Sequence, residues 1–481
     1  MAAQVINPGT NLNTVPTPAA VALASNYIDF TSDATKGWGQ QYVPDLMAKE
    51  AEVFGNRSVS GFLEQVGAEE AMAADRVVWS EQGRLHLSYT GVVSGTGVIT
   101  IEADVDGNSV DAAGEAGHGV REGDTVIVSK AGASGATVKC YVSNVTALAV
   151  TVLPYSLATL VTHTNIAATN TVSLFVYGSE YKKGQDGRTG SNSPTFKSYS
   201  NKPIIMKDLF EVSGSDASQI GWVEVSGEEG QNGYLWYLKA AGDTKARFTD
   251  YCEMAMIESE LKNTTASSTV PVDGSEGLFA AITDRGNVSY GSTAFAMTDF
   301  DTILKEFDKQ GAIEEYMMFL DRTMALQIDD MLAGLSLGAQ GGTAYGVFDN
   351  DEDMALNLGF SGFRRGSYDF YKTDWKYLND KSTRGGVVDA QVDGANKGDI
   401  EGVFVPAGVS SVYDQNLGKN LKRPFLHVRY RASQADNRKF KTWTTGSVGA
   451  TTSALDAMQM HMLTERCLVV QGANNFMMLR G

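Results

Sequence analysis

One long amphipathic stretch, residues 231–262, most constrains how this chain folds. Apolar side chains recur there along a single stripe of a helix with about 3.6 residues per turn, and they are Tyr234, Leu238, Ala241, Phe248, Cys252 and Ala255. Most of the charged side chains near its end fall elsewhere. A continuous helix over these residues would be about 45 Å long at 1.5 Å per residue. The sequence therefore predicts one long helix, followed by a mixed α/β region.

The composition is that of an ordinary globular chain with several modules. The 481 residues are 43% hydrophobic and 20% charged, which argues against disorder, a membrane protein or a single small domain. The first 35 residues contain no Lys or Arg, so we expect no secretion signal and a cytoplasmic site of synthesis. Three cysteines without CxxC spacing predict neither a disulfide framework nor a zinc site.

Two segments differ in character from the rest. Residues 1–58 place prolines among Asn, Thr and Ala and carry too little apolar surface to fold alone, so we expect another subunit to hold them as an arm. Residues 93–177 contain short strands separated by Gly, Asn and Ser, at the spacing of a small all-β barrel or sandwich. Extended stretches at 77–90 and 194–212 flank this block, which is therefore predicted to be inserted in a long two-stranded loop.

Beyond the long helix, helices and strands alternate. Thr298 with Asp301 resembles a capping pair at a helix start, and Gln310 is the expected end of that helix. A second helix is predicted over 312–335 from its apolar spacing. Met458, Met460 and Met462 alternate with polar residues, which is typical of a strand. Strands are predicted at 402–405, 425–431, 458–470 and 476–479.

This order of parts resembles the Hong Kong 97-type fold of tailed-bacteriophage major capsid proteins. Three motifs look like the C-terminal part of capsid proteins from crAss-like phages, namely RPFLHVRYR from Arg423, KTWTTGS from Lys441 and ERCLVVQGANNF from Glu465. The resemblance implies an α+β fold with an inserted small all-β domain. Its parts would be an N-terminal arm (1–58), an extended loop (59–92 and 178–225), the inserted domain (93–177), a spine helix (226–270), an axial domain (271–445) and a peripheral C-terminal β segment (446–481).

The resemblance also implies a structural role without enzymatic activity or a cofactor. Such proteins self-assemble into hexamers and pentamers that form an icosahedral head around double-stranded DNA. The implied partners are further copies of the chain, packaged DNA in local contact, and portal, scaffolding and auxiliary or head-decoration proteins, with no membrane. The implied location is the virion, assembled in the host cytoplasm. Two alternatives are an encapsulin-like cellular compartment and a β-rich surface or adhesion protein.

A basic segment interrupts a chain whose net charge is −18. Its cations are opposed locally only by Asp436, and they are Lys419, Lys422, Arg423, Arg429, Arg431, Arg438, Lys439 and Lys441. In an acidic protein, such a segment is expected to meet carboxylates of a neighbouring subunit, and local contact with DNA is the alternative.

Two motifs suggest chemistry. Asp104, Asp106, Asn108 and Glu115 stand at oxygen-ligand positions of a calcium-binding loop, but Ser109 replaces the required glycine and a strand is predicted before it. We interpret them as an acidic turn, with a metal site as the alternative. Residues 334–338 match GxSxG but follow a predicted helix, whereas a nucleophile elbow follows a strand, so hydrolase chemistry is not expected.

Overall fold

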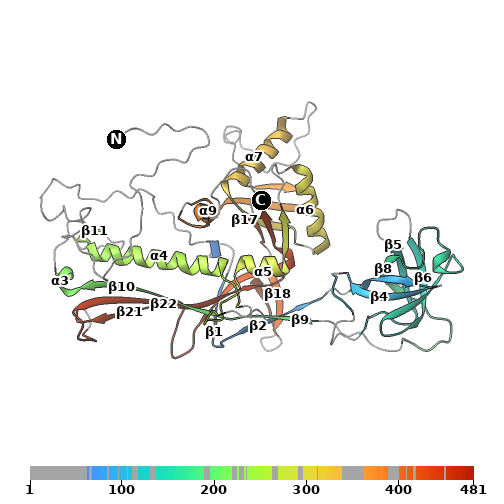
Figure 1. Cartoon of the computed structure of the whole chain (residues 1–481), viewed down its shortest axis with the longest axis horizontal. Helices are drawn as coiled ribbons and strands as arrows, with labels where there is room; N and C mark the ends of the chain where they lie inside the picture. The colour runs from blue at the N-terminus through green and yellow to red at the C-terminus, as the bar shows by residue number, and fades with distance from the viewer. Residues whose placement is uncertain are drawn as a thin grey trace. The chain divides into compact units, whose positions relative to one another are not determined.

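In the computed structural model, Ser80–Tyr199 form one unit, and the described residues up to Trp79 and from Ser200 onward form another (Figure 1). The predicted arm at 1–58 lies outside the described residues. The structure describes residues 62–63, 68–83, 86–95, 97–105, 107–110, 117–130, 137–188, 196–218, 225–226, 232–233, 236–262, 269–290, 296–310, 313–337, 362–380, 382–387, 400–407, 409–414, 419–448 and 451–481.

The inserted unit contains a closed barrel of six antiparallel strands. Its order around the barrel is β3 (Ser88–Ser94), β4 (Val98–Asp104), β7 (Ala149–Pro154), β6 (Thr137–Val145), β5 (Asp124–Lys130) and β8 (Thr171–Ser179). Alternate side chains point inward, so that Ile99, Val126 and Leu174 are completely buried, together with Leu160 from the short helix η1 (Leu160–Thr162). This cluster is formed by residues of the inserted unit alone. The prediction of a small all-β insertion is confirmed.

The extended stretches predicted on either side of the insertion each contain two strands. β2 (Val77–Gln82) pairs with β9 (Phe196–Asn201) in a two-stranded sheet. The remaining part of the first stretch enters β3, and the second continues into β10 (Ile204–Ser213).

The first sheet of the larger unit is covered by the long helix. Its order is β1 (Glu69–Met72), β20 (Leu426–Arg431), β22 (Ala457–Val470) and β10, with β21 (Lys441–Gly446) also paired to β22. Helix α4 (Trp236–Glu258) packs on one face, where Phe248 and Cys252 contact Met462. The long helix is confirmed with narrower bounds, and β22 confirms the strand predicted from alternating methionines.

The second sheet is mixed and has six strands. Its order is β13 (Asn287–Tyr290), β23 (Met477–Arg480), β17 (Ile400–Pro406), β14 (Glu315–Leu320), β16 (Tyr368–Asp374) and β15 (Gly362–Arg365). Helices α6 (Met297–Gln310) and α7 (Arg322–Leu337) pack against it through Phe300, Phe307 and Ile328. The smaller elements are α3 (Gly214–Ala217), β11 (Val225–Ser226), β12 (Asn232–Gly233), α5 (Leu278–Arg285), α8 (Lys376–Asn379), α9 (Arg384–Val387), β18 (Val409–Asp414), β19 (Lys419–Pro424) and η3 (Ala473–Asn475).

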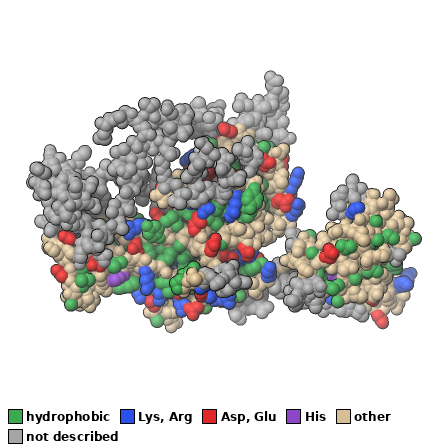
Figure 2. Space-filling view, viewed as in Figure 1, with side chains coloured by type: hydrophobic (Ala, Val, Ile, Leu, Met, Phe, Trp, Pro, Cys, Tyr) green, Lys and Arg blue, Asp and Glu red, His purple; other side chains and the backbone are tan. Residues whose placement is uncertain are grey.

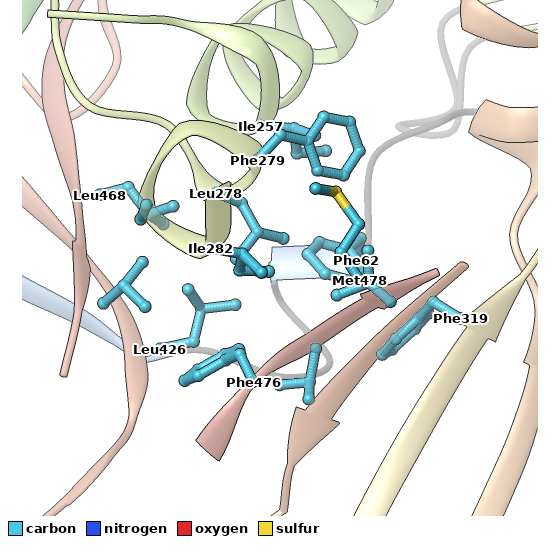
Figure 3. Close-up of a cluster of buried hydrophobic side chains, with 14 of the residues drawn as sticks. Phe62, Ile257, Leu278, Phe279, Ile282, Phe319, Leu426, Leu468, Phe476 and Met478 are labelled. Carbon is cyan, nitrogen blue, oxygen red and sulfur yellow. The ribbon is translucent and has the colours of Figure 1, made fainter. Parts of the chain in front are cut away.

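The two sheets share a hydrophobic core with α4 and α5. Figure 3 shows Leu426 and Leu468 of the first sheet in the same cluster as Met478 of the second. Ile257 at the end of α4 and Leu278 at the start of α5 are completely buried in this cluster. Because both sheets bury apolar side chains here, this core holds the larger unit together.

Phe62 joins the same core from the N-terminal side (Figure 3). Its ring stacks on Trp375, with 4.6 Å between centroids, and meets Phe319 edge-on at 4.5 Å. The carboxylate of Glu253 on α4 accepts hydrogen bonds from the backbone N–H groups of Phe62 (2.7 Å) and Leu63 (3.2 Å). The ring of Phe62 therefore anchors the chain in the core, and the backbone N–H groups of Phe62 and Leu63 attach it to Glu253 on α4.

The prediction of one helix over 312–335 is wrong, because its first part is strand β14. This strand lies between β16 and β17 and is covered on both faces: Tyr316 and Met318 join the α6/α7 side, and Phe319 the α5 side. A strand buried on both faces is apolar at successive positions, and such a run also fits a helical stripe. The Asp321 carboxylate then accepts the N–H of Met324 (2.7 Å), so the helix begins only after the strand.

The predicted capping pair of Thr298 and Asp301 is also wrong, although α6 does end at Gln310. The cap lies two residues earlier, at Ala296, whose N–H donates to the carboxylate of Asp299 (3.0 Å). Asp301 instead forms two hydrogen bonds with the Arg365 guanidinium on β15, at 2.5 and 2.8 Å. These bonds lower the pKa of Asp301 below its usual value.

Candidate assembly surfaces

The basic segment 419–441 runs through three strands of the larger unit. Lys419, Lys422 and Arg423 belong to β19, and their side chains lie outside the described residues. Arg429 and Arg431 belong to β20, and the remaining cations lie in the connection to β21 or at its start. These cations are Arg438, Lys439 and Lys441.

Strand β1 supplies carboxylates to this segment. β1 pairs in parallel with β20, and the register sets Glu70 opposite Arg429, whose side chains form an ion pair at 2.7 Å. Asp75, just after β1, pairs with Arg431, and Glu69 pairs with Lys439. These carboxylates lie more than 350 residues earlier in the sequence, so local spacing carried no signal for the pairing.

Glu465 on β22 is the buried anion of the cluster. Its side chain is 7% exposed and lies 2.8 Å from Arg438 Nε and 3.6 Å from the Arg431 guanidinium. Lys441 pairs with Asp436 at 2.8 Å, and this hydrogen bond lowers the pKa of Asp436. The five described cations of the segment therefore all have carboxylate partners within the same chain.

We expect Glu465→Gln to lower the free energy of unfolding by about 2 kcal/mol, because it removes the anion between two partly buried guanidinium groups. Urea titration of the purified chain measures this change. Asp436→Asn, at an ion pair whose two side chains are more than 40% exposed, is the matched control and should have the smaller effect. Equal losses in the two variants would contradict the assigned role of Glu465.

A second surface is the face of the first sheet that points away from α4. We call it the outer sheet face and define it by Ile205, Leu209, Trp443 and His461. Ile205 is 55% exposed, Leu209 41% and Trp443 38%. The side chains on the opposite face of the same sheet pack against α4. Trp443 stacks on His461, with 5.0 Å between ring centroids.

The outer sheet face continues into a shallow hollow beside the basic segment. Asp436, Arg438, Lys441, Trp443 and Leu463 line the hollow. Figure 2 shows one face of the molecule with hydrophobic and charged side chains intermixed over the larger unit. Exposed apolar side chains next to paired charges are typical of surfaces that bind another protein. This surface was not predicted, although Ile205 and Leu209, four residues apart on β10, add apolar residues to the outer face of a strand whose other face is also apolar.

The acidic motif of the inserted unit forms a turn at the end of β4. Asp104 Oδ1 accepts the N–H of Asn108 (2.8 Å), and Oδ2 accepts the side-chain amide of Asn108 (3.0 Å). A strand precedes this turn, as predicted, where a calcium loop of the helix–loop–helix kind has a helix. Asp106 and Glu115 lie outside the described residues, so a metal site formed by all four residues stays the untested alternative to an acidic turn.

The described residues also bear on catalytic chemistry. The GxSxG match at 334–338 begins inside α7, so a helix and not a strand precedes the serine. His118 is buried in the inserted unit, where burial lowers its pKa. Among the described parts of the chain, no three His, Cys, Asp or Glu side chains gather as metal ligands. No helix in those parts is long and apolar enough to cross a membrane.

Neither a protein-family model nor a curated protein matches this chain. Its structure is similar to that of a chain from the capsid of a native GTA particle, with 11% identity and a TM-score of 0.38 over 94% of this chain and 99% of the other. A structure from the cyanophage P-SCSP1u capsid has 10% identity and a TM-score of 0.39, over 91% and 93% of the two chains. A structure from Microbacterium phage Oxtober96 has 8% identity and a TM-score of 0.38, over 90% and 95%.

Proposed function

We propose that this chain is the major capsid protein of a tailed bacteriophage, and that it assembles into hexamers and pentamers of an icosahedral head. The order of elements carries this proposal: a β2/β9 pair flanking an inserted barrel, a long helix on one sheet, a second mixed sheet and a closing β segment. This order is the one that the Hong Kong 97-type resemblance implies. The exposed apolar side chains of the outer sheet face support self-association.

The parts of the fold are assigned accordingly. The arm is 1–58, the extended loop comprises 59–92 and 178–225 around the inserted domain at 93–177, and the spine helix region is 226–270. The axial domain is 271–445, and 446–481 is the peripheral C-terminal β segment. The motifs from Lys441 and Glu465 support a place among the crAss-like phages.

The role of the chain would be structural, and further copies of itself would be its main partners. Heterologous contacts between identical subunits close into rings or continue into sheets, as a shell requires. Portal, scaffolding and auxiliary proteins would complete the head in the virion. Local contact with packaged DNA is proposed for Lys419, Lys422 and Arg423, since the other five cations of the basic segment have carboxylate partners within the chain.

Negative-stain microscopy of the expressed chain, alone and with its scaffolding partner, tests the proposal. The expected result is closed icosahedral shells or separate hexamers and pentamers. A monomer that never assembles would contradict the proposal and favour a surface or adhesion protein. Shells that enclose a protein cargo in place of DNA would identify an encapsulin-like compartment.

A further inference from the structure

Large exposed apolar side chains gather on the outside of the barrel at β7 and β8. On β8, Phe175 and Tyr177 point outward and are 40% and 46% exposed, and Leu153 at the end of β7 is 52% exposed. On β4 the outward residues Thr100 and Glu102 are polar and exposed, and the outward Val98 is half-buried. Several large apolar side chains exposed together on the outside of a barrel with a filled core indicate a binding surface. Hydrophobic side chains are visible at the surface of the barrel in Figure 2.

Strand register brings these side chains into rows. Thr125 on β5 is paired with Tyr141 on β6, and Tyr141 with Leu153 on β7, so the two large side chains lie next to each other on the outside. In the next outward-facing row, two residues further along β5 from Thr125, Ile127 is paired with Phe175 on β8 and with Lys139 on β6. We call the surface formed by Ile127, Tyr141, Leu153, Tyr155, Phe175 and Tyr177 the barrel patch.

A cation and an anion lie on either side of Tyr141 in the strand register of the barrel patch. Lys139 is exposed and lies one row to one side of Tyr141. Glu180 follows the end of β8, beyond Tyr177, and its carboxylate accepts a 2.5 Å hydrogen bond from the hydroxyl of Tyr155. That hydrogen bond raises the pKa of Tyr155 to about 12, so its phenol keeps the proton that it donates. The tyrosine ring is thereby held at the edge of the patch.

We propose that the barrel patch binds the barrel patch of a second copy of this chain about a two-fold axis. Rotation about an axis along the row of Thr125, Tyr141 and Leu153, which lies between Lys139 and Glu180 in the strand register, places Lys139 of each copy on the side of Glu180 of the other. The surface is therefore complementary to itself in charge. Tyrosine and phenylalanine rings supply large contact area at a low cost in side-chain entropy. This inference rests on the proposed function, because it assigns the inserted domain a contact between subunits of the shell.

A patch of six side chains is small compared with the roughly 800 Å² per partner of a stable interface, so the contact is weak between free chains. A shell holds many copies close together, and the high effective concentration allows weak contacts to act jointly. The barrel contacts would therefore stabilise an assembled shell more than a free dimer.

Charge reversal in the full-length chain tests the pairing. Lys139→Glu alone and Glu180→Lys alone each place like charges opposite one another, and we expect each to raise the concentration for half-maximal assembly about tenfold. An equimolar mixture of the two variants should recover wild-type assembly, because each reversed charge then meets its opposite. Recovery also demonstrates that both variants fold. A mixture as impaired as its components would overturn the proposal.

Cross-linking tests the contact independently of shell closure. Tyr141→Cys in the full-length chain should give covalent dimers with a short bis-maleimide, because Tyr141 lies near the proposed axis. Thr100→Cys, at an exposed position on β4 of the same barrel, is the matched control. The natural cysteines Cys140, Cys252 and Cys467 are buried and should not react. Equal dimer yields at the two positions would overturn the inference, whereas dimers without shells would refute only the capsid function.

Discussion

Phe62→Ala is expected to lower the free energy of unfolding of the larger unit by about 3–5 kcal/mol. The ring is 4% exposed and lies between Trp375 and Phe319, so its loss leaves a cavity in the core shared by both sheets. Urea unfolding followed by tryptophan fluorescence measures the change, because Trp375 stacks directly on the deleted ring. The transition of the inserted barrel should not move, since its core contains no residue of the larger unit.

Val78→Ala is the matched control, because Val78 is 62% exposed. Its substitution should change the free energy of unfolding by less than about 0.5 kcal/mol. A loss below about 1 kcal/mol for Phe62→Ala would contradict the conclusion that Phe62 anchors the chain in this core.

Lys372→Met is expected to lower the free energy of unfolding by about 3–5 kcal/mol, because it leaves the Asp329 carboxylate buried without its ammonium partner. The two side chains are 10% and 11% exposed, and their ion pair joins β16 to α7. The ammonium group also donates to the backbone oxygen of Ala325 on the same helix (3.3 Å). Urea unfolding at neutral pH measures the loss.

A double-mutant cycle separates this ion pair from general packing. Adding Asp329→Leu to Lys372→Met should recover more than half of the lost stability, because no charge is then left buried. Lys309→Met is the control at an exposed ion pair, since Lys309 and Glu306 are 65% and 43% exposed. It should lower the free energy of unfolding by less than about 1 kcal/mol. If the stability losses of Lys372→Met alone and Asp329→Leu alone added up to the loss of the double variant, the two side chains would contribute no interaction energy as a pair.

Sequence reasoning succeeded where one face of an element is buried and the other is not. β22 shows alternating methionines because Met460 and Met462 lie under α4, and the barrel strands alternate because their inner side chains fill a closed core. The stripe of α4 was recognisable for the same reason. In each case the period of the apolar residues follows from the geometry of the element itself.

Prediction failed where both faces of an element are buried. β14 packs Tyr316 on one side and Phe319 on the other, so its successive apolar residues fit a helical stripe as well as a strand. Only the pairing of β14 with β16 and β17 distinguishes the strand from the helix. Strand pairing is a long-range property and leaves little trace in a local window.

The long helix, the small all-β insertion and the methionine-lined closing strand can be recognised from local patterns of residues, because helical and strand periods are local. The partners of the basic segment depend on strand pairing across the fold. Arg429 meets Glu70 because β1 pairs in parallel with β20, and Arg438 meets Glu465 because β22 lies beside β20 and β21. The tertiary structure likewise gathered the barrel patch on one side, since only strand register brings Tyr141 next to Leu153.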